Sequence, residues 1–166
     1  DRAARHPQGR RGGAGEAAVT ARTPVDFDTF LRPRSVAVVG ASPQRGAARN
    51  TLLRNLMKHG FTGPIYPVSP SHAEIEGLQA YRTLAELPQA PELAMIITPA
   101  VTVPGLIAEC GAKGVRHAIV FSSGFEEAEG GQGLALQLAA AARRHGVAVM
   151  GPNCQGVWSV RNKTIL

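Results

Sequence analysis

The chain has 166 residues, of which 44% are hydrophobic, and it carries a formal net charge of +6 at pH 7. This length fits one domain with a single buried core. No apolar run approaches the roughly 20 residues of a membrane span, so the sequence predicts neither a transmembrane helix nor the apolar part of a signal peptide. Because the chain also begins with Asp1 rather than Met, the expectation is a cytoplasmic protein and a fragment of a longer one.

Residues 1–25 are interpreted as a disordered basic segment. They hold five arginines against two acidic residues and almost no large apolar side chain, so they cannot offset the entropy lost on ordering. A basic segment can bind nucleic acid or a membrane surface. This one has no aromatic residue for base stacking and no amphipathic period, so we expect neither partner.

Short apolar runs then alternate with helical patterns. Five runs predict buried strands, at Val36–Val39, Ile65–Val68, Leu93–Ile97, Ala118–Phe121 and Val147–Met150. Three helical patterns and a shorter turn lie between them, at about Ala47–His59, Val103–Lys113, Gly133–His145 and Thr83–Leu87. The alternation predicts an α/β fold: a Rossmann-like, doubly wound, parallel five-stranded sheet with helices on both faces.

The two cysteines, Cys110 and Cys154, have neither the spacing of a metal site nor the density of a disulfide scaffold. We therefore expect free thiols and no metal. Cys154 is expected to be structural because a nucleophilic thiol needs a paired base, and no histidine is fixed near it in sequence. An approach of His117 or His145 in space stays open.

An acidic cluster, Glu126, Glu127 and Glu129, follows the fourth predicted strand. Three carboxylates so close together suggest a metal site, but carboxylates are also favoured where a helix begins. The second interpretation is preferred, so these residues are expected to start the helix that ends near His145.

Ligands of such sheets bind beyond the carboxyl ends of the strands. The loop after the first strand, which starts with Gly40, lacks the G-x-G-x-x-G pattern, and no carboxylate ends the second strand before Glu74. Both features are expected of a domain that binds NAD. A phosphate-binding P-loop is not indicated either, because no Gly-Lys-Ser/Thr triplet follows Gly40. The small residues after Gly40 nevertheless allow a close approach to an anion.

Five motifs carry a resemblance to a known family: Ser35–Ser42, Tyr66–Pro70, Ile97–Ala100, Ser122–Phe125 and Gly151–Gly156. In this order and spacing, residues 26–160 resemble the CoA-binding domain of NDP-forming acyl-CoA synthetases. That superfamily includes the α subunit of succinyl-CoA synthetase. Residues 161–166 would then start a linker to a following domain.

The resemblance implies where CoA would lie. The loop after the first strand would cradle the CoA phosphates, the second would touch the nucleotide end, the third would line the pantetheine and adenine side, and the last two would meet the reactive thiol end. The residues concerned are, loop by loop, Gly40, Ala41, Ser42 and Arg45; Ser69, Pro70 and Ser71; Thr98, Pro99, Ala100 and Val103; Ser122, Ser123 and Gly124; and Asn153.

The second of these loops departs from the family pattern. It commonly reads Asn-Pro-Lys in the family, whereas here it reads Ser69-Pro70-Ser71. The missing lysine removes a positive charge that would face a phosphate. His72 and Arg45 are the candidates to replace it.

The resemblance also implies an activity for the parent protein. Family members interconvert acid, CoA and a nucleoside triphosphate with acyl-CoA, the diphosphate and phosphate, through a phosphorylated histidine in a second domain and a separate ATP-grasp domain. Those domains would act in cis or in trans, and no catalytic residue is expected in this chain. A stand-alone CoA-binding or sensing module and a regulatory module of a protein acetyltransferase stay open. An NAD-binding domain is less favoured.

Overall fold

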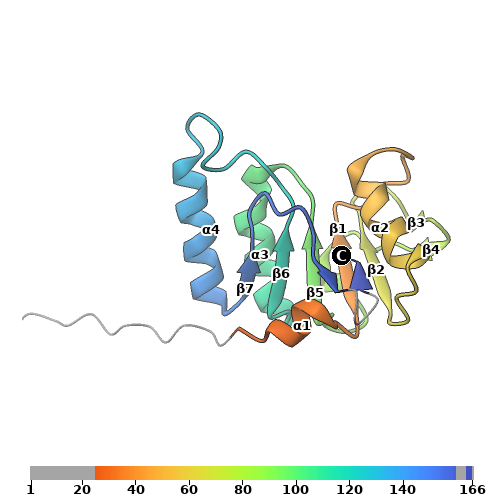
Figure 1. Ribbon diagram of the computed structural model, residues 1–166. Coiled ribbons are helices and arrows are strands. Elements are labelled where there is room, and N and C mark those ends of the chain that lie inside the picture. Colours follow the sequence, from red (N-terminus) through yellow and green to blue (C-terminus); the bar gives the residue numbers. More distant parts are fainter. Residues whose placement is uncertain (1–24, 160–163, 166) are drawn as a thin grey trace, which may run out of the picture.

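The computed structural model describes residues 25–159 and 164–165. The segment 1–25, apart from its last residue, lies outside the described residues, as does most of the linker expected at 161–166. In chain order the elements are α1 Phe27–Leu31, β1 Val36–Val39, α2 Ala48–Lys58, β2 Ile65–Val68, β3 Glu74–Ile75, β4 Leu78–Gln79, the 3-10 turn η1 Leu84–Glu86, β5 Leu93–Ile96, η2 Ala100–Thr102, α3 Val103–Lys113, β6 His117–Val120, α4 Gln132–His145, β7 Ala148–Met150, β8 Trp158–Ser159 and β9 Thr164–Ile165 (Figure 1).

The main sheet has five parallel strands in the order β2-β1-β5-β6-β7. All four residues of β1 are buried, which is expected of an unbroken apolar run in an interior strand of a parallel sheet. The predicted fold class and all five strands are confirmed, with ends that differ by at most one residue from the predicted ones.

Helices cover both faces of the sheet, as predicted. One core forms between the sheet and α3 with α4, and it contains Ile107, Leu138 and Phe125. The other forms between the sheet and α2, and it contains Leu53 and Phe30 of α1. In Figure 1, α3 and α4 lie next to each other, whereas α1 lies at the opposite end of the strands from the loops that follow them.

Several small elements were not predicted, among them α1 and the hairpin of β3 and β4. Helix α1 has only five residues and is capped by Asp26, whose carboxylate accepts a hydrogen bond from the backbone N–H of Asp28. The hairpin of β3 and β4 turns through Glu76 and Gly77, which both have positive φ angles of 53° and 80°. Those angles are typical of a type I′ turn, in which Asn-Gly is the usual pair, so Glu-Gly gives only a weak signal in the sequence.

The interpretation of the acidic cluster as a helix start is wrong. Helix α4 begins at Gln132, and Glu126, Glu127 and Glu129 lie in the turns before it. The backbone at Gly131 passes so close to the carbonyl group of Phe125 that a side chain has no room there. The Gly130-Gly131 pair therefore lets the chain fold back on itself before the helix starts.

Candidate functional site

The loops that carry the predicted site residues all follow strands of one parallel sheet, so they gather at its carboxyl edge. Strands β1 and β5 are neighbours although β2 to β4 lie between them in sequence, so the chain reverses its direction of winding there. This position is where open α/β sheets bind their ligands. Figure 1 shows the loops after β1, β5 and β6 along the upper edge of the sheet.

Gly40 allows the loop after β1 to contact the loop after β5. Its φ of 89° is in the left-handed region, and a Cβ at this position would overlap the carbonyl oxygen of Ile97 and lie 2.8 Å from Cγ2 of Thr98. Only glycine combines this backbone angle with such a close approach. The loop after β1 is thereby pressed against the loop after β5.

Hydrogen bonds made by the loop after β1 determine which of its groups remain free to contact a ligand. The N–H groups of Gly40 and Ala41 donate to the carbonyl oxygen of Val68, at 2.9 and 3.2 Å, so they hold the loop rather than an anion. The Ser42 hydroxyl accepts a hydrogen bond of 3.2 Å from the N–H of Gln44. No side chain caps α2 at Ala47. The N–H of Asn50 donates to the carbonyl oxygen of Ala47 at 2.9 Å, whereas the N–H groups of Ala48 and Arg49 are directed out of the helix.

The loop after β2 is held by its own side chains. Ser69 is buried, and its hydroxyl lies 3.1 Å from Nδ1 of His72. Its N–H donates to the carbonyl oxygen of Tyr81 at 2.8 Å. Pro70 and Ser71 are exposed. This contact with Ser69 restrains the imidazole of His72, one of the two side chains expected to replace the missing lysine.

Ser122 connects three loops. Its hydroxyl oxygen accepts a hydrogen bond of 3.1 Å from the N–H of Thr98, and its carbonyl oxygen accepts one of 3.0 Å from the N–H of Asn153. Ser122 is 5% exposed, whereas Ser123 and Asn153 are exposed. In the loop after β5, the Thr98 hydroxyl lies 2.8 Å from that of Thr102.

The N–H groups of Gly124 and Phe125 both donate to the carboxylate of Glu127, at 2.5 and 3.2 Å. Hydrogen bonds from backbone N–H groups, that of Gly124 first, then that of Glu127 itself and that of Phe125, hold the pKa of Glu127 below its ordinary value of 4.5. The loop at Gly124 therefore presents an anion-binding pair of amides, which a carboxylate of the same chain occupies.

Neither cysteine has the surroundings of a nucleophile. Cys110 is fully buried in α3, and desolvation raises the pKa of its thiol to about 12. Cys154 is partly buried and packs against the core on the α2 side, and its Sγ lies 3.9 Å from the carbonyl oxygen of Gly156. His117 begins β6 and His145 ends α4, both at the opposite edge of the sheet from Cys154.

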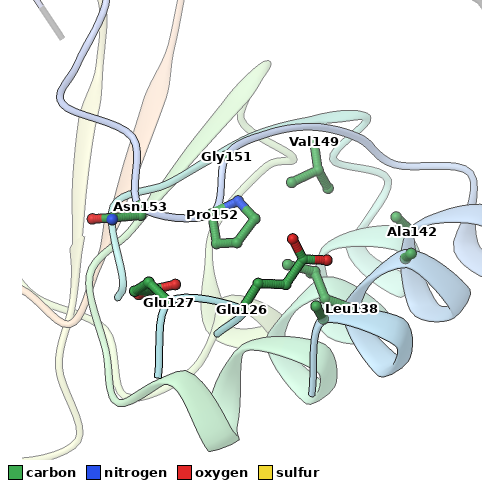
Figure 2. Close-up of a pocket in the computed structure, with 10 residues that line it drawn as sticks. Glu126, Glu127, Leu138, Ala142, Val149, Gly151, Pro152 and Asn153 are labelled. Carbon is green, nitrogen blue, oxygen red and sulfur yellow. The ribbon is translucent and has the colours of Figure 1, made fainter. Parts of the chain in front are cut away.

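A cleft of about 610 Å³ adjoins the last loop, between α4 and β7 (Figure 2). Leu138 and Val149 line it, and the Glu126 side chain extends into the space between Pro152 and Leu138. Among the predicted site residues, only Asn153 lines it. The cleft is therefore a neighbour of the site predicted at the sheet edge, separate from the loop after β1.

The structure thus brings the predicted residues together as a row rather than as one cluster. Ser69 lies beside Gly40, Gly40 beside Thr98, Thr98 beside Ser122, and Ser122 beside Asn153. The ends of the row are four strand intervals apart, or about 19 Å at about 4.8 Å each. Val103, the first residue of α3, is fully buried, and its side chain packs in the core between α3 and the sheet.

Two residues behind this row, Asn50 and Glu76, were not predicted from the sequence. Asn50 of α2 is only 1% exposed, and its Nδ2 donates to the carbonyl oxygen of Ser42 at 3.0 Å and to Oε1 of Glu76 at 2.9 Å. The available signal was a polar residue in the helical pattern at a position that should face the core.

In the part of the chain that the structure describes, no group of three or more His, Cys, Asp or Glu side chains is arranged to hold a metal ion. Within the same residues, no helix is long and apolar enough to cross a membrane.

Comparison with known proteins agrees with this architecture. A family model described as a CoA binding domain matches residues 34–159. The chain is 44% identical over 133 residues to acetate–CoA ligase [ADP-forming] I of Archaeoglobus fulgidus, and 35% identical over 138 residues to 4-hydroxybutyrate–CoA ligase [ADP-forming] of Nitrosopumilus maritimus. These alignments cover 79% and 82% of this chain, but only 19% and 20% of the relatives.

Among solved structures, the chain resembles acetyl-coenzyme A synthetase 1 of Ca. Korarchaeum cryptofilum, described as dinucleotide forming and in complex with phosphate and ADP. The TM-score is 0.78 at 36% identity, and the match covers 83% of this chain and 30% of that one. The chain belongs to the CoA-binding domain family, and it matches the CoA-binding portion of ADP-forming acyl-CoA synthetases.

Proposed function

We propose that this chain binds CoA along the carboxyl edge of its sheet, as the CoA-binding part of an ADP-forming acyl-CoA synthetase. The observation that carries the proposal is the row of connected loops. CoA is a long ligand with phosphates at one end and a thiol at the other, and a row of about 19 Å suits an extended molecule better than a compact one.

The proposal places the phosphates against the loop after β1. The first-turn N–H groups of α2 have no side-chain cap there, and the exposed Arg45 supplies a positive charge at the same loop. Gly40, Ala41 and Ser42 shape this loop, and Ser69, Pro70 and Ser71 flank it on the β2 side. His72, fixed by Ser69, is the second candidate partner of a phosphate.

The thiol end of CoA would lie toward β6 and β7. Thr98, Pro99 and Ala100 lie between the two ends, and Ser123, Gly124 and Asn153 are presented beyond them. Ser122 and Val103 are buried, so we assign them the support of these loops rather than contact with the ligand.

Acyl transfer and phosphoryl transfer are assigned to other segments of the parent protein, in cis or in trans. The parent reaction would convert a carboxylic acid, CoA and ATP into acyl-CoA, ADP and phosphate, as the names of the relatives suggest. The proposal keeps the expectation of a cytoplasmic enzyme.

The test is calorimetric titration of the 166-residue chain with CoA, with NAD and ADP as comparison ligands at the same ionic strength. We expect saturable binding of CoA and weaker binding of NAD. A preference for NAD, or no binding of CoA, would limit the resemblance to the fold.

A pair of variants tests the placement of the phosphates. Ser42→Asp and Ser42→Asn both retain an oxygen that can accept the hydrogen bond from Gln44, so both keep the turn. Only the aspartate adds a negative charge. We expect Ser42→Asp to weaken CoA binding by about tenfold or more, equivalent to about 1.4 kcal/mol, and Ser42→Asn to have a much smaller effect. Equal affinities of the two variants would remove the phosphates from this loop.

A further inference from the structure

Asn50 and Glu76 form a polar connection behind the loop after β1. Asn50 is 1% exposed, and both bonds of its Nδ2 are used: one to the carbonyl oxygen of Ser42 and one to Oε1 of Glu76. The two partners come from different segments, the loop at the end of β1 and the hairpin between β3 and β4. A buried amide that joins two such segments fixes their relative positions.

Glu76, which accepts the hydrogen bond from Asn50, has an unfavourable backbone conformation. Its φ of 53° is left-handed, a conformation that glycine or asparagine adopts more readily in this type of turn. The hairpin is anchored independently, because Ile75 is buried in the core with Leu53 of α2. The hairpin thus does not depend on the glutamate for its turn or for its packing.

We propose that Glu76 and Asn50 are positioning residues for CoA binding. Glu76 orients the Asn50 amide, which donates to the Ser42 carbonyl oxygen. This hydrogen bond sets the shape of the loop after β1 before CoA binds. This inference rests on the proposed function. It adds residues that touch no ligand, and it makes the β3–β4 hairpin part of the binding machinery. Figure 1 shows this hairpin beside α2, below the loop in question.

The hydrogen-bonding pattern explains why an ordered loop matters. The Ser42 hydroxyl holds the N–H of Gln44, so Ser42 is the point at which the loop turns toward α2. Without Asn50, this turn loses its connection to the helix whose first-turn N–H groups would face the phosphates. CoA would then have to order the loop itself, which reduces affinity.

The decisive variant is Glu76→Gly. Glycine removes the carboxylate and at the same time suits the left-handed backbone, so the hairpin should be at least as stable as before. We expect CoA to bind about fivefold to tenfold more weakly, the effect of one hydrogen bond of about 1–1.5 kcal/mol. Glu76→Gln keeps an oxygen that accepts from Asn50, and we expect it to restore affinity to within about twofold of the original chain.

Two further variants complete the test. Asn50→Ala should weaken CoA binding by about tenfold or more, and adding Glu76→Gly to it should weaken binding no further, because Glu76 acts through Asn50. Glu74→Ala, on the same hairpin and exposed, is the matched control and should leave affinity unchanged.

CoA affinity is measured by calorimetry, and unfolding by urea titration, on the whole chain. If the original chain binds CoA and Glu76→Gly binds it equally well, the positioning role is overturned while the proposed function stands. If Glu76→Gln binds as weakly as Glu76→Gly, the geometry of the hydrogen bond is not what matters and the inference also fails. Absence of CoA binding by the original chain would instead overturn the proposed function.

Discussion

The Ser122 hydroxyl holds the neighbouring loop in place: its oxygen accepts a hydrogen bond of 3.1 Å from the backbone N–H of Thr98. Ser122→Ala would leave this N–H without its acceptor in a poorly solvated position. We expect a loss of about 1–3 kcal/mol in the free energy of unfolding, measured by urea titration. Ser123→Ala, which changes an exposed neighbour, should alter stability by less than about 0.5 kcal/mol. Equal losses in the two variants would show that the hydrogen bond contributes nothing specific.

The backbone of Gly40 lies too close to Ile97 for a side chain to fit. Gly40→Ala combines a left-handed residue with an overlap on the Ile97 carbonyl oxygen, and we expect a loss of at least about 3 kcal/mol in the free energy of unfolding. Gly60→Ala is the control, because its φ of 80° is similar but no atom lies within 4 Å of the added Cβ. Its loss should be about 1–2 kcal/mol. If the two losses are the same, the contact between the loops is not tight.

Glu127 should give a pH dependence. Its pKa is lowered in the folded chain, so its contribution to stability is complete above the ordinary value of 4.5 and is lost as the pH falls through the folded pKa. The free energy of unfolding of the original chain should therefore fall more steeply below pH 4.5 than that of Glu127→Gln. In NMR spectra of nitrogen-labelled protein, the chemical shift of the Gly124 amide should change over the same pH range.

The control for this titration is Glu126→Gln, which changes the neighbouring carboxylate and leaves both backbone hydrogen bonds to Glu127 in place. It should retain the titration of the Gly124 amide. A Gly124 resonance that still titrates in Glu127→Gln would mean that another group is responsible.

The two thiols should differ in reactivity. Cys110 is fully buried with a pKa raised to about 12, whereas Cys154 is only partly buried. Because the thiolate is the reactive form, iodoacetamide should modify Cys154 first in the folded chain, and Cys110 only after unfolding in urea. Mass spectrometry locates the modified residue. Cys154→Ser should leave the folded chain unmodified, and rapid labelling of Cys110 there would contradict its burial.

The central strands were predictable because their cause is local. A run such as Val36–Val39 has no alternation of polar and apolar residues, and only burial on both faces accommodates it. The ends of the helices were also close to their predicted positions. Gly114 and Gly146, at the ends of α3 and α4, adopt the left-handed conformation that ends a helix.

The connections behind the site were not predictable in the same way. The pairing of Asn50 with Glu76 spans 26 positions of sequence and depends on how the hairpin packs on α2. Glu127 looked like a residue at the start of a helix, because a carboxylate is favourable there as well. Its actual partners, the N–H groups of Gly124 and Phe125, exist only because the chain turns back before α4.

The order of the strands has a consequence for biosynthesis. Of the five strands, β1 is synthesised first and lies inside the sheet between β2 and β5, whereas β7 is synthesised last and forms an edge. A ribosome that has completed the loop after β6 has delivered four of the five loops, yet Ser122 still lacks the hydrogen bond from Asn153. Such nascent chains would expose the unpaired side of β6. Premature termination there should give a product that aggregates or is degraded, because an unpaired strand is a template for association.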